Sequence, residues 1–200
     1  MNIYPELLGL LIEYFKKLPG IGERTAERYA LSLINLDEED LNDFAESIKG
    51  IKTTLKKCDT CGHLTDKEMC SICSDDARNH NLICVVEDYK SIFMFEKTGK
   101  FNGVYHVLGG LISPIDGINP YDLNISKLIT RCKDLKNAEI IIALRPTIEG
   151  DTTTLYLQKI LSKENVKITR LSYGIPMGAE IDYLDVLTLE RALYDRKELS

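Results

Sequence analysis

The sequence lacks the features that mark membrane-spanning, exported or disordered chains. None of its apolar runs is as long as a membrane span, which needs about 18 residues. The N-terminal stretch has no basic start and carries Glu6 and Glu13 among its apolar residues, which argues against a signal peptide. Charged residues make up 28% of the chain but are interspersed, so disorder is not expected. With 44% hydrophobic residues, the chain can bury a core as one large domain or two small ones.

Cysteines are present, and four of the six form two C-x-x-C pairs in the segment CDTCGHLTDKEMCSIC. These four are Cys58, Cys61, Cys70 and Cys73, with eight residues between the pairs. Two such turns can direct four thiolates at one Zn²⁺ in tetrahedral geometry, and a full set of ligands leaves no position for a reactive water. The pattern therefore predicts one structural zinc ion in a reducing compartment. The alternatives are an iron–sulfur site, a redox pair or chance spacing.

Four other side chains could take part in metal or acid–base chemistry. His63 follows the first cysteine pair, and we expect it to be a spectator because four thiolates are already available. Cys84 lies in an apolar strand and Cys132 on a helix face, so both are interpreted as buried small hydrophobic residues. His106 lies at a strand end without a readable nucleophile nearby, which favours a structural hydrogen-bonding role over that of a base.

The segment before the cysteines is predicted to form a helical hairpin. Apolar residues recur at about 3.6-residue spacing before and after the turn LPGIG. Pro19 ends the first helix, and two glycines permit a tight turn whose amides can bind phosphate. The stretch resembles a helix-hairpin-helix motif, which binds the nucleic-acid backbone without reading sequence. The candidate DNA-binding residues are Lys16, Lys17, Gly20, Ile21, Gly22, Arg24 and Arg28. The alternative is an ordinary helical hairpin with a glycine turn.

The acidic balance of the chain is an objection to nucleic-acid binding. The formal net charge is -6, and the first 57 residues carry ten acidic and eight basic side chains. Most of the acidic residues lie in DEEDLNDFAE, which we interpret as the start and solvated face of a third helix with Asp37 as its N-cap. The hairpin itself is then expected to stay basic, and to bind DNA weakly and in a salt-sensitive manner.

Short apolar strands alternate with helices from residue 81 onward. Strands are predicted at 82–86, 103–107, 139–144 and 166–171, with later helices at about 126–134 and 152–162. This alternation predicts a parallel sheet with helices on both faces and ligand sites beyond the carboxyl ends of the strands. Glu87 follows the first strand, and Glu149 and Asp151 follow the third. We expect these carboxylates to meet at one edge, where such a set could hold Mg²⁺.

The acidic edge resembles that of a Toprim domain, the fold of topoisomerases, primases and some nucleases. Catalytic Toprim domains carry a glutamate after the first strand, matched by Glu87, and a D-x-D after the third. Arg145 and Thr147 stand at the D-x-D positions, while Glu149 and Asp151 resemble the acidic pair that follows them. The resemblance therefore implies weak Mg²⁺ binding at best and no strand cleavage. The edge is then a partner contact or a residual cation site.

The order of hairpin, four-cysteine site and Toprim-like sheet resembles the bacterial RecR family over essentially the whole chain. LPGIGERTAERYA, GVYHVLGGLISPIDGINP and YGIPMGAEIDYLDVLTLERAL are among the stretches that carry the likeness. Two departures stand out. Arg145 replaces a usual asparagine, and Gly178-Ala179-Glu180 replaces a common Gly-Gly-Asp. These departures concern the chemistry expected at the acidic edge and leave the family resemblance unchanged.

The family resemblance implies an α+β protein of several modules. These are a helical helix-hairpin-helix domain at 1–54, a small C4 zinc finger at 55–76, an α/β Toprim domain with a parallel sheet at 80–172, and a Walker-B-like tail with a C-terminal helix at 173–200. From the residues alone, that last helix, with Val186, Leu189 and Leu193 on one face, can either cover its own sheet or join another subunit.

The resemblance also implies a function without enzymatic activity. The likeness implies that the chain assembles into a homotetrameric ring, which can encircle double- or single-stranded DNA without sequence preference. They act with RecO and RecF to load RecA at single-stranded gaps, in the bacterial cytoplasm at the nucleoid. The alternatives are a metal-dependent Toprim nuclease or topoisomerase-like enzyme, and a zinc-bearing RNA-binding module.

Overall fold

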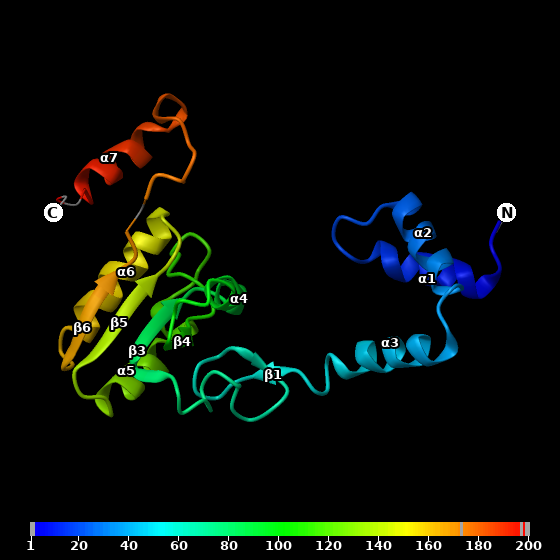
Figure 1. Cartoon of the computed structure of the whole chain (residues 1–200), viewed down its shortest axis with the longest axis horizontal. Helices are drawn as coiled ribbons and strands as arrows, with labels where there is room; N and C mark the ends of the chain where they lie inside the picture. Colours follow the sequence, from blue (N-terminus) through cyan, green and yellow to red (C-terminus); the bar gives the residue numbers. More distant parts are fainter. Residues whose placement is uncertain (1–2, 173, 197, 199–200) are drawn as a thin grey trace. The chain divides into compact units, whose positions relative to one another are not determined.

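The computed structural model describes residues 3–172, 174–196 and 198. The chain divides into two compact units, residues 1–54 and residues 55–200 (Figure 1). Within the described ranges, no helix combines the length and the apolar character that crossing a membrane would need.

Three helices form the first unit, as the apolar spacing predicts. They are α1 (Glu6–Lys16), α2 (Glu23–Leu33) and α3 (Glu38–Gly50). α1 and α2 pack around a small core in which Ile12 of α1 meets Ala26 and Ala30 of α2. The two alanines allow close approach of the helices. α3 begins at Asp37, whose side chain accepts a hydrogen bond from the Asp40 amide at 2.9 Å, and none of its residues is buried.

The second unit is built on a four-stranded parallel sheet in the order β4-β3-β5-β6. The strands are β3 (Asn79–Val86), β4 (Gly103–Val107), β5 (Ala138–Ala143) and β6 (Val166–Arg170). The helices are α4 (Tyr89–Lys97), α5 (Ile125–Lys133), α6 (Ile148–Leu161) and α7 (Val186–Tyr194), with short 3-10 turns at Pro120–Asp122 and Ile181–Tyr183. Right-handed crossovers place α4 on one face of the sheet, and α5 and α6, which contact each other, on the opposite face.

A short antiparallel pair, β1 (Lys56–Lys57) and β2 (Leu64–Thr65), precedes the sheet and carries the first cysteine pair between its strands. The four cysteines of the two C-x-x-C pairs belong to the same buried cluster as the core of the sheet. The zinc segment and the sheet therefore fold as one packed body.

The helix after β5 begins four residues earlier than the apolar pattern predicts. The Thr147 side chain accepts a hydrogen bond from the Gly150 amide at 3.2 Å and caps α6. Glu149 and Asp151 consequently lie in the first turn of a helix rather than in a loop, where their carboxylates interact favourably with the helix dipole.

Candidate zinc site, hairpin and acidic edge

The four paired cysteines converge on one point. The Sγ atoms of Cys58, Cys61, Cys70 and Cys73 all lie within 4.8 Å of one another, and all four residues are buried. Backbone amides of His63 and Cys70 donate to the Sγ atoms of Cys61 and Cys58, each at 3.4 Å. Such N–H donors stabilise thiolates, and four buried thiolates at this spacing fit tetrahedral Zn²⁺. The chain therefore carries a structural zinc site with four cysteine ligands.

The zinc segment is hydrogen-bonded directly to the sheet. The Cys61 carbonyl accepts from the amide of Val107, at the carboxyl end of β4, at 2.7 Å. The Asn124 side chain donates to the carbonyl of that same Val107 at 3.1 Å. Gly62 has a φ of +77°, and a Cβ there would lie 3.2 Å from the Val107 side chain. Only glycine allows this close approach without strain.

His63 lies beside the zinc site but is absent from the described group of possible metal ligands. Its ring packs edge-on against Phe93 of α4, with centroids 5.1 Å apart. Burial lowers the pKa of His63. These contacts make it part of the packing between the zinc segment and α4.

The hairpin presents unpaired backbone amides at the start of α2. Gly20 has a φ of +80°, and Gly22 is the N-cap, with no side chain to cap the helix. Among the described residues, the amides of Gly22, Glu23 and Arg24 have no recorded acceptor. A helix start of this kind favours a bound anion. Arg24 and Arg28 are both exposed on α2, and the Arg28 guanidinium lies 5.5 Å from the Tyr29 ring centroid.

The hairpin carries the four basic side chains that the sequence predicts, but the first of them, Lys16, is already paired with carboxylates. Lys16 Nζ lies 2.8 Å from a carboxylate oxygen of Glu13 and 2.6 Å from one of Glu23. Hydrogen bonds to Glu13 and then to Glu23 raise the pKa of Lys16. The next residue, Lys17, places its Nζ 4.7 Å from the Tyr14 ring centroid. Sequence reasoning counted charges along the chain and missed this three-residue cluster, although the Glu13–Lys16 spacing was a readable signal.

At the acidic edge, an arginine side chain forms an ion pair with the carboxylate that would bind the metal in a catalytic Toprim domain. Arg145 Nε lies 2.6 Å from one oxygen of Glu87, and Arg145 Nη2 lies 2.7 Å from the other. This is a bidentate pair between the end of β3 and the end of β5. Thr147, at the second D-x-D position, caps α6 instead of facing a metal.

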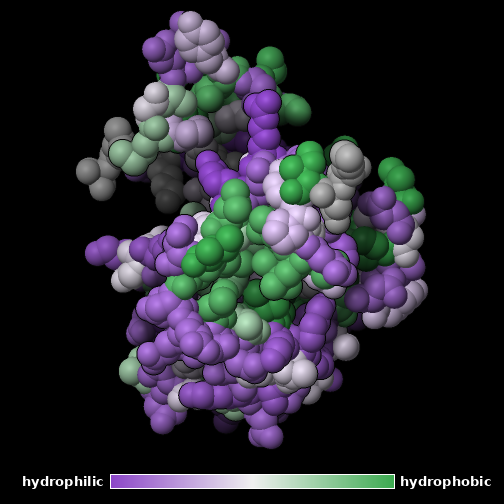
Figure 2. Space-filling model, turned by 90° about the vertical axis from the view of Figure 1, so that its right-hand side faces the viewer, coloured by the Kyte–Doolittle hydropathy of each residue, from purple (hydrophilic) through white to green (hydrophobic). Residues whose placement is uncertain are grey.

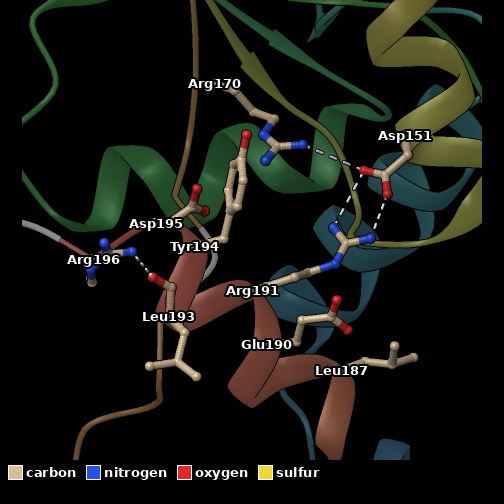
Figure 3. Close-up of a pocket in the computed structure, with 9 residues that line it drawn as sticks. All are labelled: Asp151, Arg170, Leu187, Glu190, Arg191, Leu193, Tyr194, Asp195 and Arg196. Carbon is tan, nitrogen blue, oxygen red and sulfur yellow. Dashed lines mark hydrogen bonds and ion pairs between the residues drawn. The ribbon is translucent and has the colours of Figure 1, made fainter.

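The other carboxylates of the edge lie in different surroundings. Asp151 faces Arg191 of α7, with one oxygen 2.5 Å from its Nη2, and lies 3.6 Å from Arg170 Nη1 (Figure 3). These side chains line a cavity of about 580 Å³ between α6, β6 and α7. Glu149 has no ion-pair partner among the described side chains, and hydrogen bonds from its own amide and from Thr147 lower its pKa. Sequence reasoning missed Arg170 and Arg191, since nothing local links them to Asp151.

Two buried polar groups have structural roles that their sequence context does not show. His106 Nε2 donates to the Asn124 carbonyl at 2.9 Å, and burial lowers the pKa of His106 to about 4. The Tyr105 hydroxyl donates to Glu96 at 2.7 Å, and Glu96 also accepts a bidentate pair from Arg78. The role of His106 is therefore positional, as expected, because it joins β4 to the segment before α5.

Known protein families match the hairpin, the zinc segment, the sheet domain and the C-terminal segment of the chain. The family described as "RecR, helix-hairpin-helix" matches residues 8–51, and the RecR family of four-cysteine zinc finger domains matches residues 55–75. The Toprim domain family matches residues 81–172, and the family "RecR, C-terminal" matches residues 174–197. A curated protein of Finegoldia magna, "Recombination protein RecR", is 44% identical over 201 residues, covering 100% of both chains.

Proposed function

Because the chain belongs to the RecR family of recombination proteins, we propose that it is a non-catalytic, DNA-binding mediator of recombinational DNA repair. In this role it acts with RecO and RecF to help load RecA at single-stranded gaps. Its modules are the hairpin domain at 1–54, the zinc finger at 55–76, the Toprim domain at 80–172 and the tail at 173–200. A protein with this function works at the bacterial nucleoid, in the cytoplasm.

The observation that supports a non-catalytic function is the ion pair between Glu87 and Arg145. A Toprim enzyme needs its glutamate and D-x-D carboxylates to hold a divalent cation that stabilises the transferring phosphoryl group. Here the Glu87 carboxylate is neutralised by a guanidinium at 2.6 Å and 2.7 Å. An incoming cation would have to displace a bidentate charge-assisted pair, with no D-x-D carboxylate to help it. Glu149, which is half-buried and has no ion-pair partner among the described side chains, is then suited to contact RecO rather than a metal.

The hairpin supports contact with the DNA backbone. Unpaired amides at the start of α2 and the exposed Arg24 and Arg28 recognise phosphate, which every sequence presents in the same way. Double-stranded and single-stranded DNA are therefore both ligands, without sequence preference.

Exposed apolar side chains support assembly with further copies of the chain. Leu41, Phe44, Ile48 and Ile51 form an exposed stripe along and just after α3, and no residue of α7 is buried although Leu187 and Leu193 are apolar. Figure 2 shows hydrophobic atoms reaching the surface between hydrophilic ones on the face that it draws. Isolated monomers rarely expose such stripes, and we propose a homo-oligomeric ring, with a tetramer as the expected form.

The DNA-binding proposal is tested by the salt dependence of affinity. Arg24→Ala and Arg28→Ala should each weaken binding to labelled duplex DNA, because each removes one phosphate contact. Each should also lower the slope of log K against log[salt] by about 0.9. Fluorescence anisotropy across a salt series measures both quantities, with Lys49→Ala on α3 as a control for the loss of one exposed cation. An unchanged salt slope in both arginine variants would show that these two side chains do not contact the DNA phosphates.

The non-catalytic proposal is tested on supercoiled and nicked DNA with Mg²⁺ or Mn²⁺. We expect the DNA to remain intact. Cleavage that disappears in Glu87→Ala would instead identify a metal-dependent Toprim enzyme. Preference for duplex RNA over duplex DNA in competition would favour an RNA-binding module.

A further inference from the structure

The first basic residue of the hairpin lies in a local excess of negative charge. Lys16 is the last residue of α1, Glu23 is the first residue of α2, and their 2.6 Å ion pair spans the turn between the two helices. Glu13, one helical turn before Lys16, adds the second carboxylate at 2.8 Å. Glu6, Glu13 and Glu23 also line one cavity of about 360 Å³ in this unit. A single ammonium group thus faces two carboxylates.

Glu23 occupies the place where a phosphate is most strongly attracted. It is the first residue of α2, where the helix dipole and the unpaired amides favour a negative charge. The N-cap Gly22 offers no side-chain acceptor of its own. The Glu23 carboxylate and a DNA phosphate therefore compete for the same positive end of the helix and for the same lysine.

We propose that the Glu13–Lys16–Glu23 cluster is a built-in competitor that weakens the binding of DNA phosphate to the hairpin. In the DNA-free protein the two glutamates hold Lys16, and this cation becomes a phosphate contact only when Glu23 is neutralised or displaced. Arg24 and Arg28 then carry the contacts of the wild-type hairpin. The inference rests on the proposed DNA-binding function. It identifies Glu23 as the residue that sets the affinity of the hairpin for DNA.

The test is a double-mutant cycle between Glu23 and Lys16 in the full-length protein. Glu23→Gln should raise the affinity for duplex DNA about fivefold at low salt, the size of one exposed ion pair. It should steepen the salt slope by about 0.9, since Lys16 gains a phosphate. The amide oxygen of glutamine still accepts a hydrogen bond from Lys16, so the hairpin should keep its fold, and thermal unfolding checks this. The added slope should disappear in the Lys16→Ala, Glu23→Gln double variant.

Glu46→Gln is the matched control. Glu46 pairs with Lys49 at 2.5 Å on α3, so this change removes the same charge and releases a lysine away from the hairpin turn. Equal gains in Glu46→Gln and Glu23→Gln would overturn the inference, because net charge alone would explain them. A gain that persists without Lys16 would also overturn it. If no variant binds DNA, the proposed function fails together with the inference. If the wild type binds but Glu23→Gln has no effect, only the inference fails.

Discussion

Gly150 is the residue at which the turn from β5 into α6 has no room for a side chain. A Cβ there would lie 1.9 Å from the Arg145 carbonyl oxygen, which belongs to the backbone and cannot rotate away. Gly150→Ala must therefore move the start of α6, with Thr147, Glu149 and Asp151 on it. We expect a loss of about 2 kcal/mol in the free energy of unfolding, measured by urea denaturation.

Gly174→Ala is the control for that change. A Cβ at Gly174 would have no atom within 4 Å, and its φ is not in the left-handed region. The substitution should leave the unfolding free energy within about 0.5 kcal/mol of the wild type. Equal effects at both positions would show that the close backbone approach at Gly150 does not determine the local stability.

His106 predicts a pH dependence of stability whose sign follows from its burial. Burial, with smaller contributions from the nearby charges of Arg131 and Lys127, lowers its pKa to about 4, whereas an unfolded histidine titrates near pH 6.5. As the pH falls below 6.5, the unfolded state takes up the proton first, so the folded state loses stability. We expect a loss of about 1 kcal/mol between pH 8 and pH 5.5.

The measurement is chemical denaturation of wild type and His106→Gln across that pH range. Glutamine can still hydrogen-bond the Asn124 carbonyl but does not titrate, so its stability should vary less with pH. Because all other ionisable groups are shared, the difference between the two curves reports His106. Parallel curves would contradict a depressed pKa at this residue.

At the scale of elements, the zinc segment acts as part of the sheet. It shares a buried cluster with the strands, and Cys61 is hydrogen-bonded to Val107 at the end of β4. Zinc binding supplies folding energy to a segment that is too small to have its own core. The consequences of metal loss should therefore appear in the second compact unit, residues 55–200.

Removing zinc with a chelator, or with Cys58→Ser, should destabilise the second unit by about 3 kcal/mol or more. For a chain of this size, that corresponds to a fall of about 10 °C in melting temperature. Hydrogen exchange should show lost protection at Val107 and Leu108, while α1 and α2 keep theirs. Cys132→Ala, which changes a buried thiol outside the metal cluster, is the control. Unchanged protection along β4 would show that the zinc segment folds independently of the sheet.

At the scale of the whole molecule, the exposed apolar stripes determine the expected state of association. Ile48→Glu on α3 and Leu187→Glu on α7 each place a charge on a side chain that is at least half exposed in the single chain. Neither change should unfold the chain, but each should reduce the molar mass measured by light scattering, because it buries a charge in a subunit interface. Ser126→Glu, on the exposed surface of α5, should leave the molar mass unchanged.

If both apolar variants keep the wild-type molar mass, these stripes do not form the interfaces of an oligomer. A second measurement compares the molar mass of the wild type by light scattering with and without duplex DNA. It distinguishes a ring that closes on DNA from one that forms beforehand.

Much of the fold follows from short-range patterns in the sequence. The two C-x-x-C pairs converge because a tight turn brings two nearby thiolates together. The strand GVYHV coincides with β4, and the parallel sheet follows from strand–helix alternation. The predicted start of α6 is wrong, because its first turn, IEGD, is polar apart from Ile148, and its cap, Thr147, stands at a position that resembles part of a metal motif.

The sequence by itself determined the modules and their order, the cysteine set for zinc and the glycine turn, because each depends on neighbours a few residues apart. Only the tertiary structure decided which charges meet. Lys16 meets Glu23 across a turn, Arg145 reaches Glu87 over 58 positions, and Arg191 reaches Asp151 over 40. The physical reason is that periodicity and spacing report local backbone geometry, whereas an ion pair is set by the distance between side chains after the chain has folded.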